Sequence, residues 1–71
     1  MSGVPELGVA VRRLRKAHGW TLAELAAYVG MSVASLSEFE RGRKDTTLAK
    51  TRLLAEAFGL KHSELWREAG L

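Results

Sequence analysis

Apolar residues recur along the chain at spacings of three and four positions, which is the period of an amphipathic α-helix. The first such segment begins at about residue 6 or 7 and ends at residue 18. A second, short segment begins at Thr21, and others cover about residues 33–41, 48–58 and 63–69. No stretch alternates apolar and polar residues for long enough to indicate a strand. The pattern predicts an all-α chain of five helices.

The predicted helix ends coincide with residues suited to start or stop a helix. Glycines that can take a positive φ follow the helical segments directly, at Gly19, Gly30, Gly42 and Gly59. Thr21 and Glu24 have the spacing of a capping box, in which each side chain accepts a hydrogen bond from the other residue's backbone N–H. Ser32 is expected to cap the third helix, and either Thr46 or Thr47 the fourth.

Each predicted helix has one apolar face, and together these faces should form the core. The expected core residues are Leu7, Val11, Leu14, Leu22, Leu25, Ala26, Val29, Leu36, Phe39, Leu48, Leu54, Ala55 and Phe58. His18 falls on the apolar face of the first helix and is expected in the core or at the helix end. Trp20, just before the second helix, is expected to pack on the first turn of that helix.

Residues 21–41 predict a helix-turn-helix unit. Ala26 is small where the two helices must cross closely, and Gly30 can adopt the left-handed conformation of the turn without steric cost. Leu36 then points from the second of these helices into the core. Such a unit holds its second helix out in front of the body of the protein.

Several short motifs follow one another in a fixed order along most of the chain. They comprise Arg12, Arg13, Leu14, Arg15 and Lys16 before Gly19, Leu25-Ala26 with Gly30, Met31-Ser32, Leu36-Ser37, Glu40-Arg41-Gly42, Leu54-Ala55, Phe58-Gly59-Leu60 and Leu65. In this order the sequence resembles the Cro/phage-repressor (XRE-type) helix-turn-helix family over about residues 7–65. The resemblance implies a lambda-repressor-like fold of five helices and binding to double-stranded DNA.

The resemblance also implies a buried ion pair between Arg15 and Glu40, which would link the first helix to the end of the third. The alternative is that both are ordinary solvated surface charges. Glu40 falls beside Leu36 on the inward side of its helix, which favours the pair because a buried charge needs a partner.

The outward face of the third helix is the surface expected to read DNA. By helical angle and resemblance, the residues expected to contact bases are Val33, Ala34, Ser37, Glu38 and Arg41. This face lacks the Gln and Asn side chains that pair with adenine, whereas Val33 and Ala34 suit thymine methyl groups. Glu38 suits a cytosine amino group but repels phosphates. The alternative is a solvated face that binds nothing.

Hydroxyl and basic side chains around that helix are expected to contact DNA phosphates. They are Ser32, Ser35, Arg43, Lys44, Thr46, Thr47 and Lys50. The exposed backbone N–H groups at helix N-termini can hold phosphates as well. A basic run is also typical of an ordinary wet surface, but its position next to the DNA-reading helix favours phosphate contact.

The C-terminal segment carries several large apolar residues. A small DNA-binding domain rarely buries so much apolar surface at its terminus without a second subunit. Since members of the family often dimerise through their last helix, the two-fold interface of a homodimer is expected at Leu60, Leu65, Trp66 and Leu71. The alternative is simple packing of these side chains into the protein's own core.

Chain length and composition limit the classes of function that are open to this chain. The 71 residues allow a single domain, residues 1–71, and a domain this small gains stability from a partner subunit. The absence of cysteine removes disulfides, thiolate metal sites and cysteine nucleophiles, and the two histidines lack acidic partners at ligand spacing. We therefore expect no enzyme, no metal and no cofactor. The net charge of +3 permits nucleic acid without demonstrating it.

The expected location is the cytoplasm. Residues 1–6 lack the basic and apolar regions of a secretory signal, and no apolar run is long enough to span a membrane. The absence of disulfides fits a reducing compartment.

Two functional hypotheses follow. The first is a sequence-specific transcriptional regulator that binds a two-fold operator as a homodimer and blocks or contacts RNA polymerase. The second is an antitoxin-type module that pairs with a toxin and also binds DNA, because residues 48–60 resemble such antitoxins.

Overall fold

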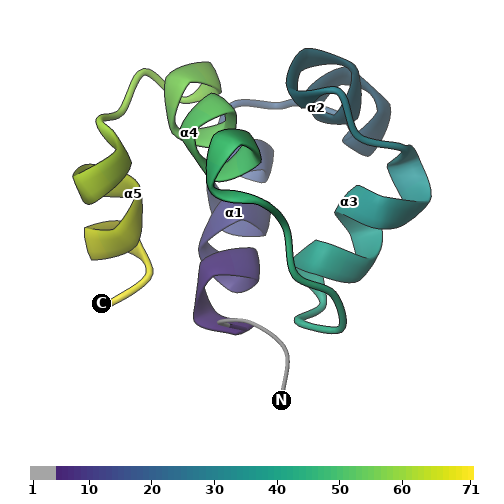
Figure 1. Ribbon diagram of the computed structural model, residues 1–71. Coiled ribbons are helices and arrows are strands. Elements are labelled where there is room, and N and C mark those ends of the chain that lie inside the picture. Colours follow the sequence, from purple (N-terminus) through teal and green to yellow (C-terminus); the bar gives the residue numbers. More distant parts are fainter. Residues whose placement is uncertain (1–4) are drawn as a thin grey trace.

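A computed structural model describes residues 5–71, which form five α-helices (Figure 1). Their bounds are α1 (Pro5–Ala17), α2 (Leu22–Val29), α3 (Val33–Glu40), α4 (Leu48–Ala57) and α5 (His62–Glu68). The predicted all-α architecture is confirmed, and the helix ends lie close to the predicted ones. Residues 1–4, which include most of the segment considered for a secretory signal, lie outside the described part of the chain.

Local hydrogen bonds begin the helices as the sequence predicts. Thr21 and Glu24 form the capping box: the Glu24 carboxylate accepts from the Thr21 N–H at 2.8 Å, and the Thr21 hydroxyl accepts from the Glu24 N–H at 3.1 Å. At α3 the Ser32 hydroxyl accepts from the Ser35 N–H at 3.0 Å, which is a side-chain cap alone. At α4 the cap is Thr47 and not Thr46.

The helices surround one apolar core. In Figure 1, α1 lies in the middle, with α2 and α3 on one side and α5 on the other. α1 packs on α3 and α5, α2 packs on α3 and α4, and α4 packs on α5. All five helices supply the largest fully buried side chains, which are Val11, Leu25, Val29, Leu36, Leu54 and Leu65. None of the helices within residues 5–71 combines the length and apolar character needed to cross a bilayer.

One expected core residue is not in the core. Leu48 was expected on the buried face of α4, but 57% of its surface is exposed. It is the first residue of α4, so it stands beyond the edge of the core, and Thr51 takes the buried position one turn later. The Thr51 hydroxyl is satisfied there because it donates to the Leu48 carbonyl at 2.8 Å.

The aromatic residues near the end of α1 form a stack at the surface. His18 lies just past the helix end and is exposed, and its ring centroid is 4.5 Å from that of Trp20. Trp20 stacks in turn on Phe58 at 5.6 Å. Trp20 and Leu25 line the same shallow hollow, so the indole packs near the first turn of α2, as predicted.

Candidate nucleic-acid interface

A buried ion pair positions the C-terminal end of α3. The Arg15 Nε donates to one carboxylate oxygen of Glu40 at 2.8 Å, and Nη2 donates to the other at 3.0 Å. Nη1 of Arg15 donates to the Trp20 carbonyl at 3.0 Å. The hydrogen bond to Glu40 raises the pKa of Arg15, although burial acts in the opposite direction. Because α1 carries Arg15 and α3 carries Glu40, the pair implied by the resemblance ties α3 to the body of the protein.

A tight turn fixes the start of α3 relative to α2. Gly30 ends α2 with φ of 72°, a left-handed conformation that suits glycine. The Met31 N–H donates back to the Ala26 carbonyl at 2.9 Å. From α4, the Lys50 ammonium donates to the Gly30 carbonyl at 3.1 Å. The turn is therefore held from within α2 and from α4.

Burial divides α3 into two faces. Leu36, Phe39 and Glu40 are buried against the core. The other face carries the residues expected to contact bases: Val33, which is 46% exposed, Ala34 and Arg41, which are exposed, and Ser37 and Glu38, which are half-buried. The outer face of α3 therefore presents both polar and apolar side chains to solvent.

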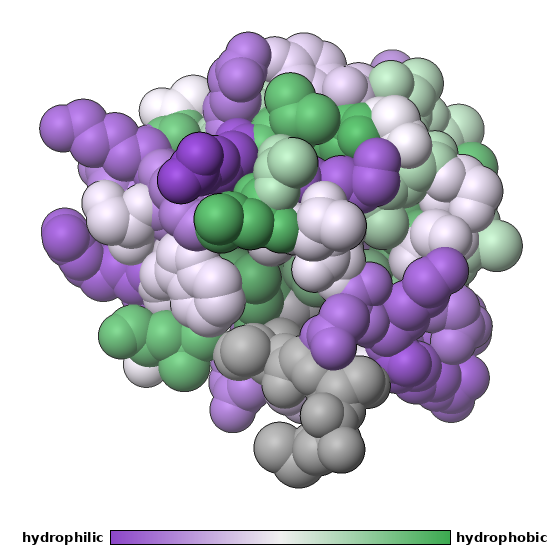
Figure 2. Space-filling view, viewed as in Figure 1, coloured by the Kyte–Doolittle hydropathy of each residue, from purple (hydrophilic) through white to green (hydrophobic). Residues whose placement is uncertain are grey.

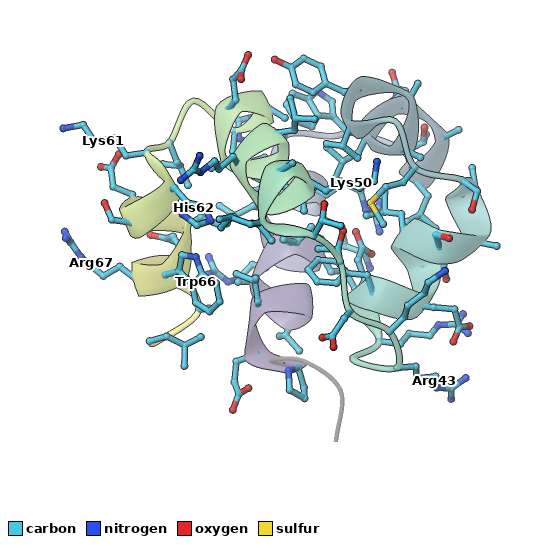
Figure 3. The ribbon with its side chains drawn as sticks, in the orientation of Figure 1. Arg43, Lys50, Lys61, His62, Trp66 and Arg67 are labelled. Atoms are coloured by element: carbon cyan, nitrogen blue, oxygen red, sulfur yellow. The ribbon has the colours of Figure 1, made fainter. Side chains whose placement is uncertain are left out.

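Cations lie at both ends of α3. Lys50 reaches the turn before α3, whereas Arg43 lies in the loop after α3 and is exposed (Figure 3). Lys44 is next to Arg43 and donates to the Ser35 hydroxyl on α3 at 2.9 Å. These contacts bring most of the expected phosphate-binding residues together around one helix.

Two threonines among the expected phosphate-binding residues are placed differently. Thr46 is half-buried and lines an apolar hollow with Leu48 and Trp66. That hollow includes no residue of the outward face of α3. The Thr47 hydroxyl accepts from the Lys50 N–H at 3.2 Å and so serves as a helix cap.

The structure adds one basic residue that the sequence analysis did not select. Arg12 on α1 lines a shallow hollow together with Ser37 and Arg41. Arg12 lies one helical turn before Arg15, which reaches the end of α3. That spacing in the sequence could have indicated that Arg12 lies near α3 as well.

The four residues expected at a subunit interface differ in exposure. Leu65 is fully buried in the core of its own chain, so its assignment to the interface is wrong: it has no surface to offer a partner. Leu60 and Trp66 are half-buried, and both pack against the core. Leu71 is 59% exposed.

The chain is similar in sequence to transcriptional regulators and to an antitoxin. A sequence profile of the helix-turn-helix family matches residues 11–65. Over 59 residues the chain is 41% identical to an uncharacterised HTH-type transcriptional regulator, y4dJ, of Sinorhizobium fredii, and the match covers 83% of this chain and 77% of that protein. It is 40% identical over 43 residues to the antitoxin HipB of Escherichia coli. This match covers 61% of this chain and 49% of HipB.

Solved structures agree with the sequence matches. The clp gene regulator ClgR of Corynebacterium glutamicum superposes with a TM-score of 0.87 and 36% identity, covering 93% of this chain and 70% of ClgR. The restriction-modification controller protein C.AhdI of Aeromonas hydrophila superposes with a TM-score of 0.79 and 30% sequence identity. The match covers 86% of this chain and 92% of C.AhdI. The chain therefore belongs to the helix-turn-helix family of DNA-binding transcriptional regulators and has their all-α, lambda-repressor-like fold.

Proposed function

We propose that the protein binds a two-fold operator as a homodimer and regulates transcription by occupying it. The α3 helix of each subunit enters one of two successive major grooves, which are about 34 Å apart. The observation that carries this proposal is the division of α3, whose inner face is buried and whose outer face is open between cations at both ends.

Within this arrangement the residues on and around α3 have two roles. Val33 and Ala34 contact thymine methyl groups, Ser37 and Glu38 hydrogen-bond to base edges, and Arg41 pairs with guanine. Outside the groove, the phosphates are held by Ser32, Ser35, Arg43, Lys44 and Lys50, with Arg12 as a further cation. Thr47 caps the N-terminus of α4, and the free backbone N–H groups at this helix end suit a phosphate.

Occupancy of an operator is enough to regulate a gene. A dimer on a promoter blocks RNA polymerase, or contacts it and favours its binding, and both actions take place on DNA in the cytoplasm. ClgR is a gene regulator and C.AhdI is a controller protein, which supports a regulatory role for this chain as well.

The likeness to HipB supports a second candidate, an antitoxin that binds a toxin and also binds DNA. The discriminating observations are a second chain that co-purifies with the protein and a toxin reading frame next to its gene. A protein that purifies alone, from a locus without such a neighbour, contradicts this candidate.

Selection of bound sites from random DNA, followed by footprinting, tests the main proposal. The expected footprint has two symmetric half-sites whose centres are about 10 base pairs apart. Ser37→Ala and Glu38→Ala should each change the preferred sequence, because both side chains lie on the open face of α3. A protein that protects no symmetric site, or variants that select the same sites as the original chain, would contradict the proposal.

A further inference from the structure

A shallow hollow beside α2 is lined by two aromatic side chains and one carboxylate. Trp20 and Tyr28 supply the aromatic rings and Glu24 the carboxylate, while the buried side chain of Leu25 completes the lining. The volume of the hollow is about 180 Å³. Pockets for drug-sized ligands are larger, roughly 300–1,000 Å³. The hollow beside α2 therefore has room for one small chemical group.

The indole of Trp20 is held in place without a ligand. Its ring centroid lies 4.5 Å from that of His18 and 5.6 Å from that of Phe58. Because the His18 and Phe58 centroids are only 5.4 Å apart, both rings lie toward the same side of the indole and leave its opposite face uncovered. The Trp20 carbonyl also accepts from Nη1 of Arg15 at 3.0 Å. An aromatic surface fixed in this way loses little conformational entropy when it binds a ligand.

Two carboxylates give the hollow a negative border. Oε1 of Glu24 accepts the capping hydrogen bond from Thr21, which leaves the second oxygen of this exposed side chain available. The Tyr28 hydroxyl donates to Oε1 of Glu56 on α4 at 3.4 Å, and the Glu56 charge raises the pKa of Tyr28 above its ordinary value. The two ion pairs found within residues 5–71 include neither Glu24 nor Glu56. A group that enters the hollow therefore meets uncompensated negative charge.

The hollow is separate from the candidate DNA interface. None of the residues expected to contact bases or phosphates lines it. Figure 2 shows strongly hydrophilic residues at the lower right, by the end of α3, and at the left, by α5, whereas the surface over α2 at the upper right is mostly apolar or weakly polar. DNA phosphates are also repelled by Glu24 and Glu56. The occupant of the hollow is therefore not DNA.

Aromatic rings and carboxylates together are suited to an organic cation. A metal ion does not fit, because Ca²⁺ needs roughly six or more oxygen ligands and no group of three or more His, Cys, Asp or Glu within residues 5–71 could hold a metal. We propose that the hollow binds a small organic cation of the alkylammonium class, with Trp20 and Tyr28 against its alkyl groups and Glu24 as its counter-ion. This site goes beyond the proposed operator binding and does not depend on it.

A matched pair of ligands tests whether the charge is recognised. Choline and 3,3-dimethylbutan-1-ol have the same shape, but a neutral carbon replaces the ammonium nitrogen in the alcohol. Each is titrated into the full chain at constant ionic strength, and NMR follows the indole Nε1–H of Trp20 and the ring of Tyr28. Choline should bind about tenfold more tightly than the alcohol, because the rings and the carboxylate both attract its charge.

Two sources carry this chemistry, a free alkylammonium compound and the lysine side chain of a partner protein. A titration with a short peptide that has one lysine between glycines distinguishes them. A peptide that binds more tightly than choline identifies the lysine side chain as the source, and a weaker one identifies the free compound. Both results require that the signals of Trp20 and Tyr28 shift, and both support the cation site.

Substitutions locate the binding. Glu24→Gln removes the counter-charge and Tyr28→Leu removes the ring but keeps apolar bulk, so each should weaken choline binding about threefold to fivefold. Glu64→Gln is the matched control. Glu64 makes the same contact at the start of α5, where its carboxylate accepts from the Lys61 N–H at 2.8 Å, but it does not line the hollow. This variant should bind choline as tightly as the original chain does.

Three results would overturn the cation site. They are an alcohol that binds as tightly as choline, choline shifts that are absent from Trp20 and Tyr28, and a Glu24→Gln variant that binds choline as tightly as Glu64→Gln does. Circular dichroism checks that each variant remains folded. Footprinting reports operator binding separately, so a failure of this site and a failure of the proposed function are distinguishable.

Discussion

Gly8 in α1 lies directly against the backbone of Phe39 in α3, so closely that a Cβ at residue 8 would overlap the Phe39 carbonyl oxygen. The same Cβ would come within 3.1 Å of the Cα of Glu40. Backbone cannot move aside as a flexible side chain can, so this glycine sets the distance between α1 and the end of α3. The hydrogen bonds from Arg15 to Glu40 depend on that distance.

Gly8→Ala should therefore lower the free energy of unfolding by about 2 kcal/mol, the typical cost of forcing extra volume into a packed contact. Helix propensity alone acts the other way and favours alanine by about 1 kcal/mol. Urea unfolding measures the balance, and Val9→Ala is the neighbouring control because Val9 is 63% exposed. A Gly8→Ala protein as stable as the original chain would show that α1 and α3 can separate at no cost.

The Arg15–Glu40 pair makes a second prediction about stability. Either Arg15→Ala or Glu40→Ala leaves one buried charge without its partner, which costs about 3–5 kcal/mol. Replacing both, with Arg15→Met and Glu40→Leu, should cost much less because no charge is then left in the core. Chemical denaturation of the three variants measures this difference. If the single and double variants lost the same free energy of unfolding, the loss would not come from a buried charge left without its partner.

The capping box predicts a pH dependence. Hydrogen bonds from Thr21, the backbone N–H above all, hold the pKa of Glu24 below its ordinary value of 4.5. A carboxylate whose folded pKa is lowered adds stability above its unfolded pKa and loses it as the pH falls through the folded value. Glu24→Gln keeps an oxygen acceptor but removes the titration.

The stability advantage of the original chain over Glu24→Gln should accordingly shrink as the pH is lowered from about 6 to about 3. Urea unfolding at several pH values gives this difference, and an NMR titration of the Glu24 carboxyl gives its pKa directly. A difference that stays constant over this range, with an unshifted titration, would rule out the capping carboxylate as its source.

Local signals made much of the fold predictable. Thr21, Ser32 and Gly30 act on the backbone within a few residues, so their roles as caps and as turn residue follow from sequence spacing alone. The inward position of Leu36 follows in the same way from helical angle within one short segment. Arg15 and Glu40 are far apart in sequence, so the family resemblance was needed to indicate that they meet, with the inward position of Glu40 in its support.

The remaining features depend on how the helices pack, which no local pattern specifies. Leu65 and Trp66 are neighbours on α5, and only the packing of α5 against α1 and α4 decides that the first is fully buried and the second half-buried. Leu48 follows the period of its helix but falls beyond the core edge. The sequence carries no signal for the role of Gly8, because its constraint comes from the backbone of Phe39.

Salt dependence tests the phosphate-binding role of the loop after α3. The Arg43→Ala, Lys44→Ala double variant should weaken binding to all DNA sequences alike and reduce the slope of log K against log salt by about two units. Lys61→Ala is the control, because Lys61 lies on the far side of the molecule, at α5 (Figure 3). Binding titrations at several salt concentrations give the slopes. An unchanged slope in the double variant would place the phosphates elsewhere.

The apolar start of α3 predicts how thymine is read. Val33 is 46% exposed and Ala34 next to it is exposed, and neither side chain can hydrogen-bond to a base. The thymine methyl group is the base feature that matches them. Replacing thymine by uracil removes that methyl group and leaves every hydrogen-bonding group in place. If α3 enters the major groove, uracil at the contacted positions of the operator should weaken binding about threefold to fivefold, the value of roughly one buried methyl group.

A matched variant separates this contact from an effect of uracil on the DNA itself. Val33→Ala withdraws the side chain from the methyl group, so this variant should bind the thymine and uracil operators with more similar affinities than the original chain does. Fluorescence anisotropy with the two operators and the two proteins completes a double-mutant cycle. Equal losses on uracil substitution in both proteins would mean that the methyl group is not read by Val33, and an original chain indifferent to uracil would mean that α3 does not read thymine through its methyl group at all.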